Sequence, residues 1–197
     1  MAKATGRGTT YFFEHQSKQF VLRHYLRGGL IGKVLDQQYV YTGLQRTRAW
    51  QEFTLLKHMT SLGLPCPTPI AAHIKKIGIY YRADIILSKI PQANDLYNLL
   101  QSTHIDSEIW RHIGQTIAKF HRQQVYHHDL NIHNIMLDAS NQAWLIDFDK
   151  CSIKHGNKWK KANLARLHRS FEKEKANKGI EWSNSDWQHL LAGYHLT

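Results

Sequence analysis

The chain has 197 residues, 42% of them hydrophobic and 11% aromatic, which suits one domain or two small lobes with a packed core and excludes global disorder. The net charge of +11 favours an anionic partner such as nucleic acid, anionic lipid or a phosphorylated molecule. Cys66 and Cys151 form no C-x-x-C pair, which suits a reducing compartment and argues against a cysteine-based zinc site. Since no secretory signal is visible and no stretch approaches about 20 apolar residues, we expect a soluble cytoplasmic protein.

The N-terminal half is predicted to hold strands and one helix. The stretches TTYFFE and QFVLRHYL alternate as two strands would, joined by the turn HQSK. Residues 47–62 have helical apolar spacing, and the residues on one stripe are Ala49, Phe53, Leu56 and Met59. The proline-containing segment GLPCPTP then prevents the helix from continuing, and IGIYYRADIIL is rich in β-forming residues.

The C-terminal half is predicted to be mainly helical. Helices are expected at residues 95–101 and 106–123, and Asp106 is a plausible N-cap of the second. The polar stretch VYHHDLNIHNIMLD follows, then a short apolar strand in AWLIDFDK and a basic helix at residues 161–175. Strands first and helices later indicate an α+β fold with a small β-rich N-lobe and a mainly helical C-lobe.

Three oxygen-bearing side chains stand out in the C-terminal half. Asp129 and Asn134 lie five residues apart in a loop after a long helix, and Asp147 ends the apolar strand AWLI thirteen residues later. Carboxylate and amide oxygens are hard ligands that suit Mg²⁺. Phosphoryl transfer needs such a set, with one acid to orient the attacking hydroxyl and two oxygens to hold the metal on the phosphates.

These residues stand in two motifs of protein-kinase-like enzymes. HHDLNIHN, residues 127–134, resembles the catalytic loop H-R-D-L-x-x-x-N, and IDFD, residues 146–149, resembles the metal-binding D-F-G that follows it. The resemblance implies that Asp129 is the catalytic aspartate that orients and deprotonates the acceptor hydroxyl, that Asn134 and Asp147 bind Mg²⁺, and that ATP is the phosphate donor. His128 replaces the usual arginine, so we do not expect control by activation-loop phosphorylation. Asp149 replaces the usual glycine, so we do not expect the flip of the D-F-G motif.

The nucleotide side of such an enzyme needs a cation on a strand. Arg23 occupies the place of the lysine in V-A-I-K, with Val21 where an adenine-packing residue would lie. Glu52 falls on the apolar stripe of its helix, where an acid is costly unless a cation meets it, so we expect it to pair with Arg23. Gly6 and Gly8 precede these strands as a phosphate-covering hairpin would, and any strand before them should be short or absent.

The histidines of this region have a structural interpretation. We expect His127 to pack and hydrogen-bond so that it steadies the loop. A zinc cluster is disfavoured, because no helical i, i+4 pair occurs among His121, His127, His128 and His133.

A wider resemblance covers nearly the whole chain. FVLRHYLRGGLIGKVL, RAWQEFTLLKHMTSLGLPCPTPIAA, HHDLNIHNIMLD and LIDFDK…NLARLHRSFEKEK are together similar to the 3-deoxy-D-manno-octulosonic acid (Kdo) kinases, which belong with the lipopolysaccharide core kinases. The resemblance implies a single kinase-like domain, with residues 1–90 as N-lobe and 91–197 as C-lobe. It also implies ATP-dependent phosphorylation of the 4-hydroxyl of Kdo on a lipid A precursor, by a peripheral enzyme at the cytoplasmic face of the inner membrane.

Two alternatives stay open. A heptose or aminoglycoside kinase would keep every motif, and a non-catalytic module could bind an anionic membrane or RNA; we expect no nucleic acid partner, because no aromatic stacking platform is evident. The oligomeric state is left open. Residues 154–178 contain nine Lys or Arg against two Glu, so this segment is expected to hold the enzyme at an anionic membrane, with Trp159 in the headgroup region. The bland interpretation is a solvated helix packed on the C-lobe through Leu164, Leu167 and Phe171, and the two interpretations are compatible.

Overall fold

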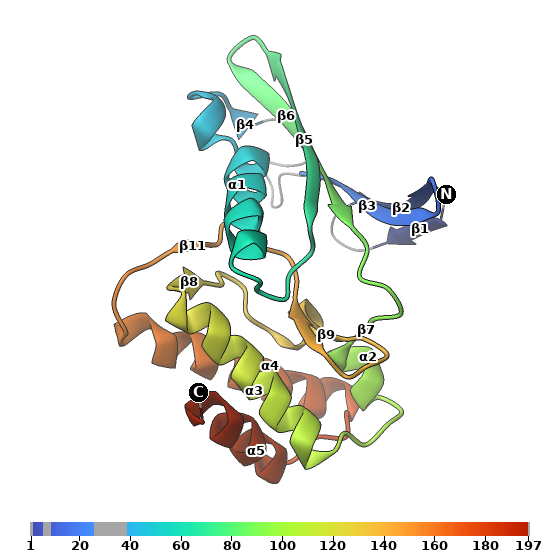
Figure 1. Ribbon diagram of the computed structural model, residues 1–197, viewed down its shortest axis with the longest axis vertical. Coiled ribbons are helices and arrows are strands. Elements are labelled where there is room, and N and C mark those ends of the chain that lie inside the picture. Colours follow the sequence, from blue (N-terminus) through green and yellow to red (C-terminus); the bar gives the residue numbers. More distant parts are fainter. Residues whose placement is uncertain (1, 6–8, 26–38, 197) are drawn as a thin grey trace. The chain divides into compact units, whose positions relative to one another are not determined.

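The computed structural model describes residues 2–5, 9–25 and 39–196 (Figure 1). The chain divides into two compact units. The N-terminal unit comprises Met1–Leu62 and Pro67–Lys89, and the C-terminal unit comprises Gly63–Cys66 and Ile90–Thr197. The expectation of a single domain with lobes at residues 1–90 and 91–197 stays a prediction.

The N-terminal unit is built on an antiparallel sheet in the order β1-β2-β3-β6-β4, with β5 also paired to β6. Its strands are β1 Ala2–Thr5, β2 Thr9–His15, β3 Lys18–His24, β4 Tyr39–Val40, β5 Pro69–Ile77 and β6 Tyr80–Ser88. Gln16 and Ser17 connect β2 to β3 with φ values of 49° and 57°, as a two-residue hairpin turn that matches the twist of its strands requires. The expected strand pair and its turn are confirmed.

The helix of this unit, α1 Arg48–Ser61, follows the short 3₁₀ helix η2 Leu44–Arg46. Its buried residues are Ala49, Glu52, Leu55, Leu56 and Met59. The predicted helix is therefore confirmed, with one difference on its apolar face. Phe53 is only half-buried and stacks on Trp50, while Leu55 takes a buried position beside Leu56.

In the C-terminal unit, α3 Ser107–Arg122 and α5 Asn184–His195 pack directly against each other (Figure 1). Two glycines allow these helices to approach closely. A Cβ on Gly114 would lie 1.9 Å from the carbonyl oxygen of Leu190, and one on Gly193 would lie 2.0 Å from that of Arg111. The predicted helices at 95–101 and 106–123 are confirmed as α2 Leu96–Leu100 and α3, whereas α5 was not predicted.

Short paired strands frame both motif-bearing loops. β8 Val125–Tyr126 pairs with β11 Ser152–Ile153, while β9 Ile135–Leu137 pairs with β10 Ala143–Leu145 and with β7 Asn94–Asp95. The loop at residues 127–134, which ends in the 3₁₀ helix η3 Ile132–Asn134, thus leaves one strand pair and enters the other. The segment at residues 146–151 makes the reverse connection, so the same two strand pairs fix both loops.

The basic segment forms α4 Lys158–Lys178. Leu164, Leu167 and Phe171 are buried, so the expected packed helix is confirmed. The placement of Trp159 in a lipid headgroup region is wrong. Its side chain is only 7% exposed, its indole Nε1 donates to the carbonyl oxygen of Lys154 at 2.7 Å, and its ring packs edge-on against Tyr126. Among the described residues, no helix has the length and apolar character needed to cross a membrane.

Candidate active site

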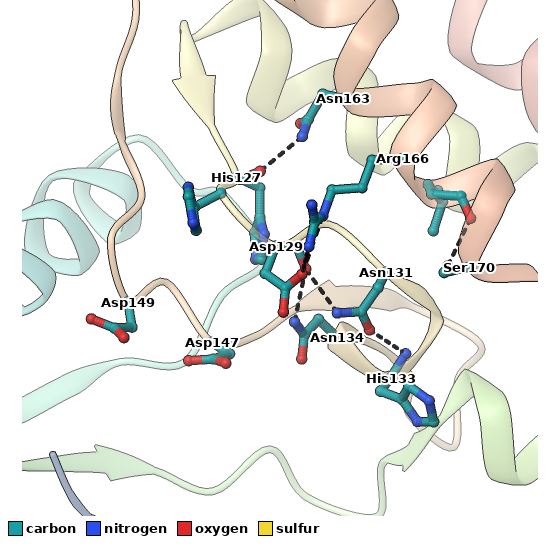
Figure 2. A network of polar contacts seen from close by, with 12 residues as sticks. His127, Asp129, Asn131, His133, Asn134, Asp147, Asp149, Asn163, Arg166 and Ser170 are labelled. Atoms are coloured by element: carbon teal, nitrogen blue, oxygen red, sulfur yellow. Dashed lines mark hydrogen bonds and ion pairs between the residues drawn. The ribbon is translucent and has the colours of Figure 1, made fainter. Parts of the chain in front are cut away.

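The loop at residues 127–134 holds Asp129 by its backbone. The side-chain amides of Asn131 and Asn134 both donate to the carbonyl oxygen of Asp129, at 3.0 and 2.9 Å. The amide oxygen of Asn131 also accepts the backbone N–H of His133 at 2.8 Å. Figure 2 shows these contacts around Asp129, whose carboxylate stays 46% exposed. The loop therefore presents a rigidly held carboxylate to solvent.

His127 joins this loop to the strand that carries the second motif. It is buried, and its Nε2 donates to the carbonyl oxygen of Ile146 at 2.9 Å. The backbone N–H of Ile146 in turn donates to the carbonyl oxygen of Asn134 at 3.0 Å. Burial lowers the pKa of His127, so the ring is neutral at pH 7. The predicted structural role of His127 is confirmed, and its contact brings Asp147 close to the loop.

Asp147 has an unusual backbone conformation. Its φ is 62°, in the left-handed region that few residues other than glycine adopt and that is often found at functional sites. The next residue, Phe148, is buried and stacks on Phe120. The backbone N–H of Cys151 closes the turn on the carbonyl oxygen of Phe148 at 3.0 Å. The buried ring thus anchors the turn that aims Asp147.

A row of polar residues on α4 supports the same loop, and sequence reasoning missed it. Its members, spaced three, four and four residues apart on one helix face, are Asn163, Arg166, Ser170 and Glu174, here termed the α4 polar row. Three contacts reach the loop backbone or a loop ring: Asn163 Nδ2 to the His127 carbonyl oxygen at 2.8 Å, the Ile132 N–H to Ser170 Oγ at 3.1 Å, and His133 Nε2 to Glu174 Oε1 at 3.6 Å.

The fourth member contacts the carboxylate of Asp129. Arg166 donates through Nε at 3.1 Å and through Nη2 to the same oxygen, Oδ1 (Figure 2). Partial burial of Asp129 opposes ionisation, but the hydrogen bonds and charge of Arg166 outweigh it and hold the pKa of Asp129 below its usual value. Asp129 is therefore ionised at pH 7. Both hydrogen bonds from Arg166 go to its Oδ1, and neither goes to Oδ2.

The residues expected on the nucleotide side lie in the N-terminal unit. Arg23, on β3, forms the expected ion pair with Glu52, on α1, whose side chain is only 1% exposed. The hydroxyl of Tyr25 donates to the same oxygen of Glu52, and burial, followed by the charge of Glu52, raises the pKa of Tyr25. Val21 lies half-buried on β3, opposite Phe12 and Leu87. Gly6 and Gly8 lie outside the described residues. The roles of these residues in nucleotide binding stay predictions.

The two expected metal ligands have the chemistry that Mg²⁺ prefers, one amide oxygen and one carboxylate. The Nδ2 of Asn134 donates to the Asp129 carbonyl, so its amide oxygen is the atom that would bind the metal, together with the carboxylate of Asp147. The described part of the chain holds no group of three or more His, Cys, Asp or Glu side chains that could bind a metal. Mg²⁺ needs no such cage, because one or two protein oxygens, with water and substrate phosphates, complete its octahedron.

Comparison with known proteins assigns the family. Residues 1–194 match the family model described as the lipopolysaccharide kinase (Kdo/WaaP) family. Three relatives carry the name 3-deoxy-D-manno-octulosonic acid kinase. The Vibrio cholerae protein is 50% identical over 93% of this chain and 78% of its own length. The Photobacterium profundum protein is 45% identical (100% and 83%), and the Haemophilus influenzae protein is 47% identical (99% and 84%).

The fold has a counterpart among solved structures. The kinase of the Cydia pomonella granulovirus matches with a TM-score of 0.57 and 14% identity, over 78% of this chain and 51% of that one. At this identity the match speaks for the fold alone, and it confirms the expected α+β, protein-kinase-like architecture. The chain belongs to the lipopolysaccharide kinase (Kdo/WaaP) family.

Proposed function

We propose that this protein transfers the γ-phosphoryl group of ATP to the 4-hydroxyl of Kdo on a lipid A precursor, in the biosynthesis of the lipopolysaccharide core. Relatives at 45–50% identity are named 3-deoxy-D-manno-octulosonic acid kinases, and the chain is accordingly a phosphotransferase with an alcohol acceptor. The observation that carries the proposal is the held, half-exposed carboxylate of Asp129, tied through Ile146 to the turn of Asp147.

Each candidate residue has a separate role in the proposed reaction. Asp129 keeps Oδ1 on Arg166, so its Oδ2 orients the acceptor hydroxyl and accepts its proton. Asn134 and Asp147 would hold Mg²⁺, which when bound neutralises charge on the phosphates of ATP. Arg23 is always protonated and offers several N–H donors. It therefore suits a phosphate, although protein kinases use a lysine at this position.

The experiment is mass spectrometry of Kdo-lipid A precursor after incubation with ATP and Mg²⁺. We expect the mass of one added phosphate, at position 4 of Kdo, and no product when Mg²⁺ is removed with chelator. Heptose-bearing and aminoglycoside acceptors serve as competitors. Transfer to one of these with none to Kdo would refute the proposed acceptor. Activity that survives chelation would refute the proposed requirement for Mg²⁺.

The membrane location is a further part of the proposal. An acceptor anchored in lipid requires the enzyme at the surface, and α4 offers exposed cations, each of which contributes about 1 kcal/mol near an anionic leaflet. The test is sedimentation with anionic vesicles at low and high salt. Replacing Lys158, Lys160 and Lys161 with Gln should reduce binding. The matched control replaces three exposed lysines outside α4, Lys57, Lys75 and Lys119, and should bind as the parent does. Equal binding of both triple variants would remove α4 as the anchor.

A further inference from the structure

Arg166 differs from the other members of the α4 polar row in its exposure and in its unused donor. Its side chain is 47% exposed, whereas Asn163 is buried and the side chain of Glu174 is 14% exposed. Two of its nitrogens, Nε and Nη2, are on Asp129 Oδ1. The third, Nη1, makes no hydrogen bond to any described residue. A cation with a free donor thus borders the carboxylate that receives the acceptor.

The loop does not need this cation to hold its shape. Its backbone is already bonded at His127 by Asn163, at Ile132 by Ser170, and at the carbonyl of Asp129 by two amides. A positive charge beside Asp129 also stabilises the ionised carboxylate, which weakens it as a proton acceptor. The charge of Arg166 is therefore better explained by something that binds there than by support of the loop.

The chemistry of the proposed acceptor supplies a partner. An octulosonic acid carries a carboxylate on ring carbon 2 and the hydroxyl to be phosphorylated on carbon 4, with one ring carbon between them. When that hydroxyl hydrogen-bonds to Oδ2 of Asp129, the carboxylate of the sugar lies close enough to contact the neighbouring guanidinium of Arg166. Arginine binds carboxylates with parallel N–H donors, and such charge-assisted hydrogen bonds are stronger than neutral ones.

We propose that Arg166 binds the carboxylate of the acidic sugar and thereby makes the site selective for acidic over neutral acceptors. This inference rests on the proposed function and deepens it. Arg166 then has two contacts in the complex: Asp129 Oδ1, which it orients, and the acceptor carboxylate, which positions the sugar so that its hydroxyl faces Oδ2.

The test measures phosphate transfer by four proteins to each of two acceptors. The acceptors are Kdo-lipid A precursor and the same molecule with its carboxylate converted to an amide. The proteins are the wild type, Arg166→Gln, Arg166→Lys and the control Arg169→Gln, which removes an exposed arginine one turn along α4 that has no hydrogen bond or ion pair to any described residue. The readout is kcat/KM for each pair.

We expect the wild type and Arg169→Gln to lose roughly 10- to 150-fold when the carboxylate becomes an amide, the range for hydrogen bonds to charged groups. Arg166→Gln should lose a similar factor on the natural acceptor and discriminate little between the two, and Arg166→Lys should lie between. If Arg166→Gln falls by one factor on both acceptors, the arginine only orients Asp129 and the proposal is overturned.

Failure of the proposed function looks different. In that case the wild type transfers no phosphate to either Kdo acceptor but does to another sugar. Thermal unfolding and ATP affinity of each variant identify a folding defect. Should Arg166→Gln fail to fold, the wild-type comparison of acid and amide and the intermediate value for Arg166→Lys decide the question, since a wild type that accepts both equally also overturns the proposal.

Discussion

The two units hold their candidate functional residues by different means. In the N-terminal unit, Arg23, Tyr25 and Glu52 contact one another through their own charged or hydroxyl groups, from one strand and one helix. In the C-terminal unit, the backbone of Asp129 is held by two loop amides, and the α4 polar row holds the backbone of the neighbouring residues His127 and Ile132. We therefore expect that a charge can be removed from the C-terminal site with little effect on the fold. In the N-terminal unit, the groups expected to bind the nucleotide are the same groups that hold one another in place.

The largest expected effect is loss of turnover in Asp129→Asn. The variant keeps the shape of the side chain but removes the proton acceptor, a role on the order of 10²–10⁴ in rate. Because the amides of Asn131 and Asn134 bind its backbone carbonyl, which the variant keeps, the melting temperature and ATP affinity should change little. Steady-state kinetics and calorimetry check this. A variant with near wild-type turnover would remove Asp129 from the mechanism.

The N-terminal pair should show the opposite behaviour, with stability and nucleotide affinity falling together. Arg23→Gln takes the guanidinium from a carboxylate that is only 1% exposed, and such changes cost about 3–5 kcal/mol. Glu52→Gln should cost less, since Arg23 is 21% exposed and reaches water. The double variant should lose less than the sum of the singles. Urea unfolding and ATP titration measure both quantities, and strict additivity would mean that the pair is not coupled.

One feature of each unit could be predicted from the sequence. The Arg23–Glu52 contact could be, because an acid on an apolar helix stripe requires a cation. The loop around Asp129 could be, because Asp129, Asn134 and Asp147 stand in the order and at the spacing of two kinase motifs, which chance rarely produces together. In both cases the signal lies in the type and spacing of a few residues, which the sequence shows directly.

The α4 polar row could not be predicted in the same way. Asn163, Arg166 and Ser170 lie among so many lysines that the helix resembles a solvated surface, and Trp159 resembles a membrane anchor. Which polar residues face a loop depends on segments 30 to 40 residues earlier in the chain. The only local signal was their spacing of three and four residues between the buried Leu164, Leu167 and Phe171. α5 was missed because Gly193 lowers its helical propensity, and because its close contact with α3 depends on Gly114, which is far away in the sequence.

A smaller effect is expected from pH, at a buried histidine of the C-terminal unit. His121 Nε2 donates to Asn163 and its Nδ1 accepts from the hydroxyl of Tyr194 at 2.8 Å. Burial lowers the pKa of His121 to about 4, from an ordinary value of 6.5, against the opposing hydrogen bond with Asn163. Below pH 6.5 the unfolded chain gains a proton that the folded chain does not, so stability is complete above 6.5 and falls towards pH 4. The loss approaches about 3 kcal/mol.

The matched variant for this prediction is His121→Gln, which cannot gain the proton. Its difference from the wild type in free energy of unfolding should be constant above the ordinary pKa of 6.5 and shrink as the pH falls from there towards 4. Chemical denaturation at several pH values measures this difference, and subtracting the variant removes the contribution of other titrating groups. A difference that stays constant across the range would show that His121 titrates alike in the folded and unfolded chains.

The smallest expected effect isolates a single contact of the α4 polar row. Ser170 Oγ accepts the backbone N–H of Ile132, a fully buried residue, and donates to the carbonyl oxygen of Leu167 at 2.7 Å. Ser61 makes the same kind of bond to a carbonyl of its own helix, at 2.7 Å on His58, but is exposed in α1. Ser170→Ala leaves a buried donor unsatisfied, at about 1–3 kcal/mol, whereas Ser61→Ala should stay within about 0.5 kcal/mol. Amide hydrogen exchange at Ile132 should accelerate in Ser170→Ala alone. If the two alanine variants lose equal stability and the Ile132 amide exchanges at its wild-type rate, the helix does not hold the loop in solution.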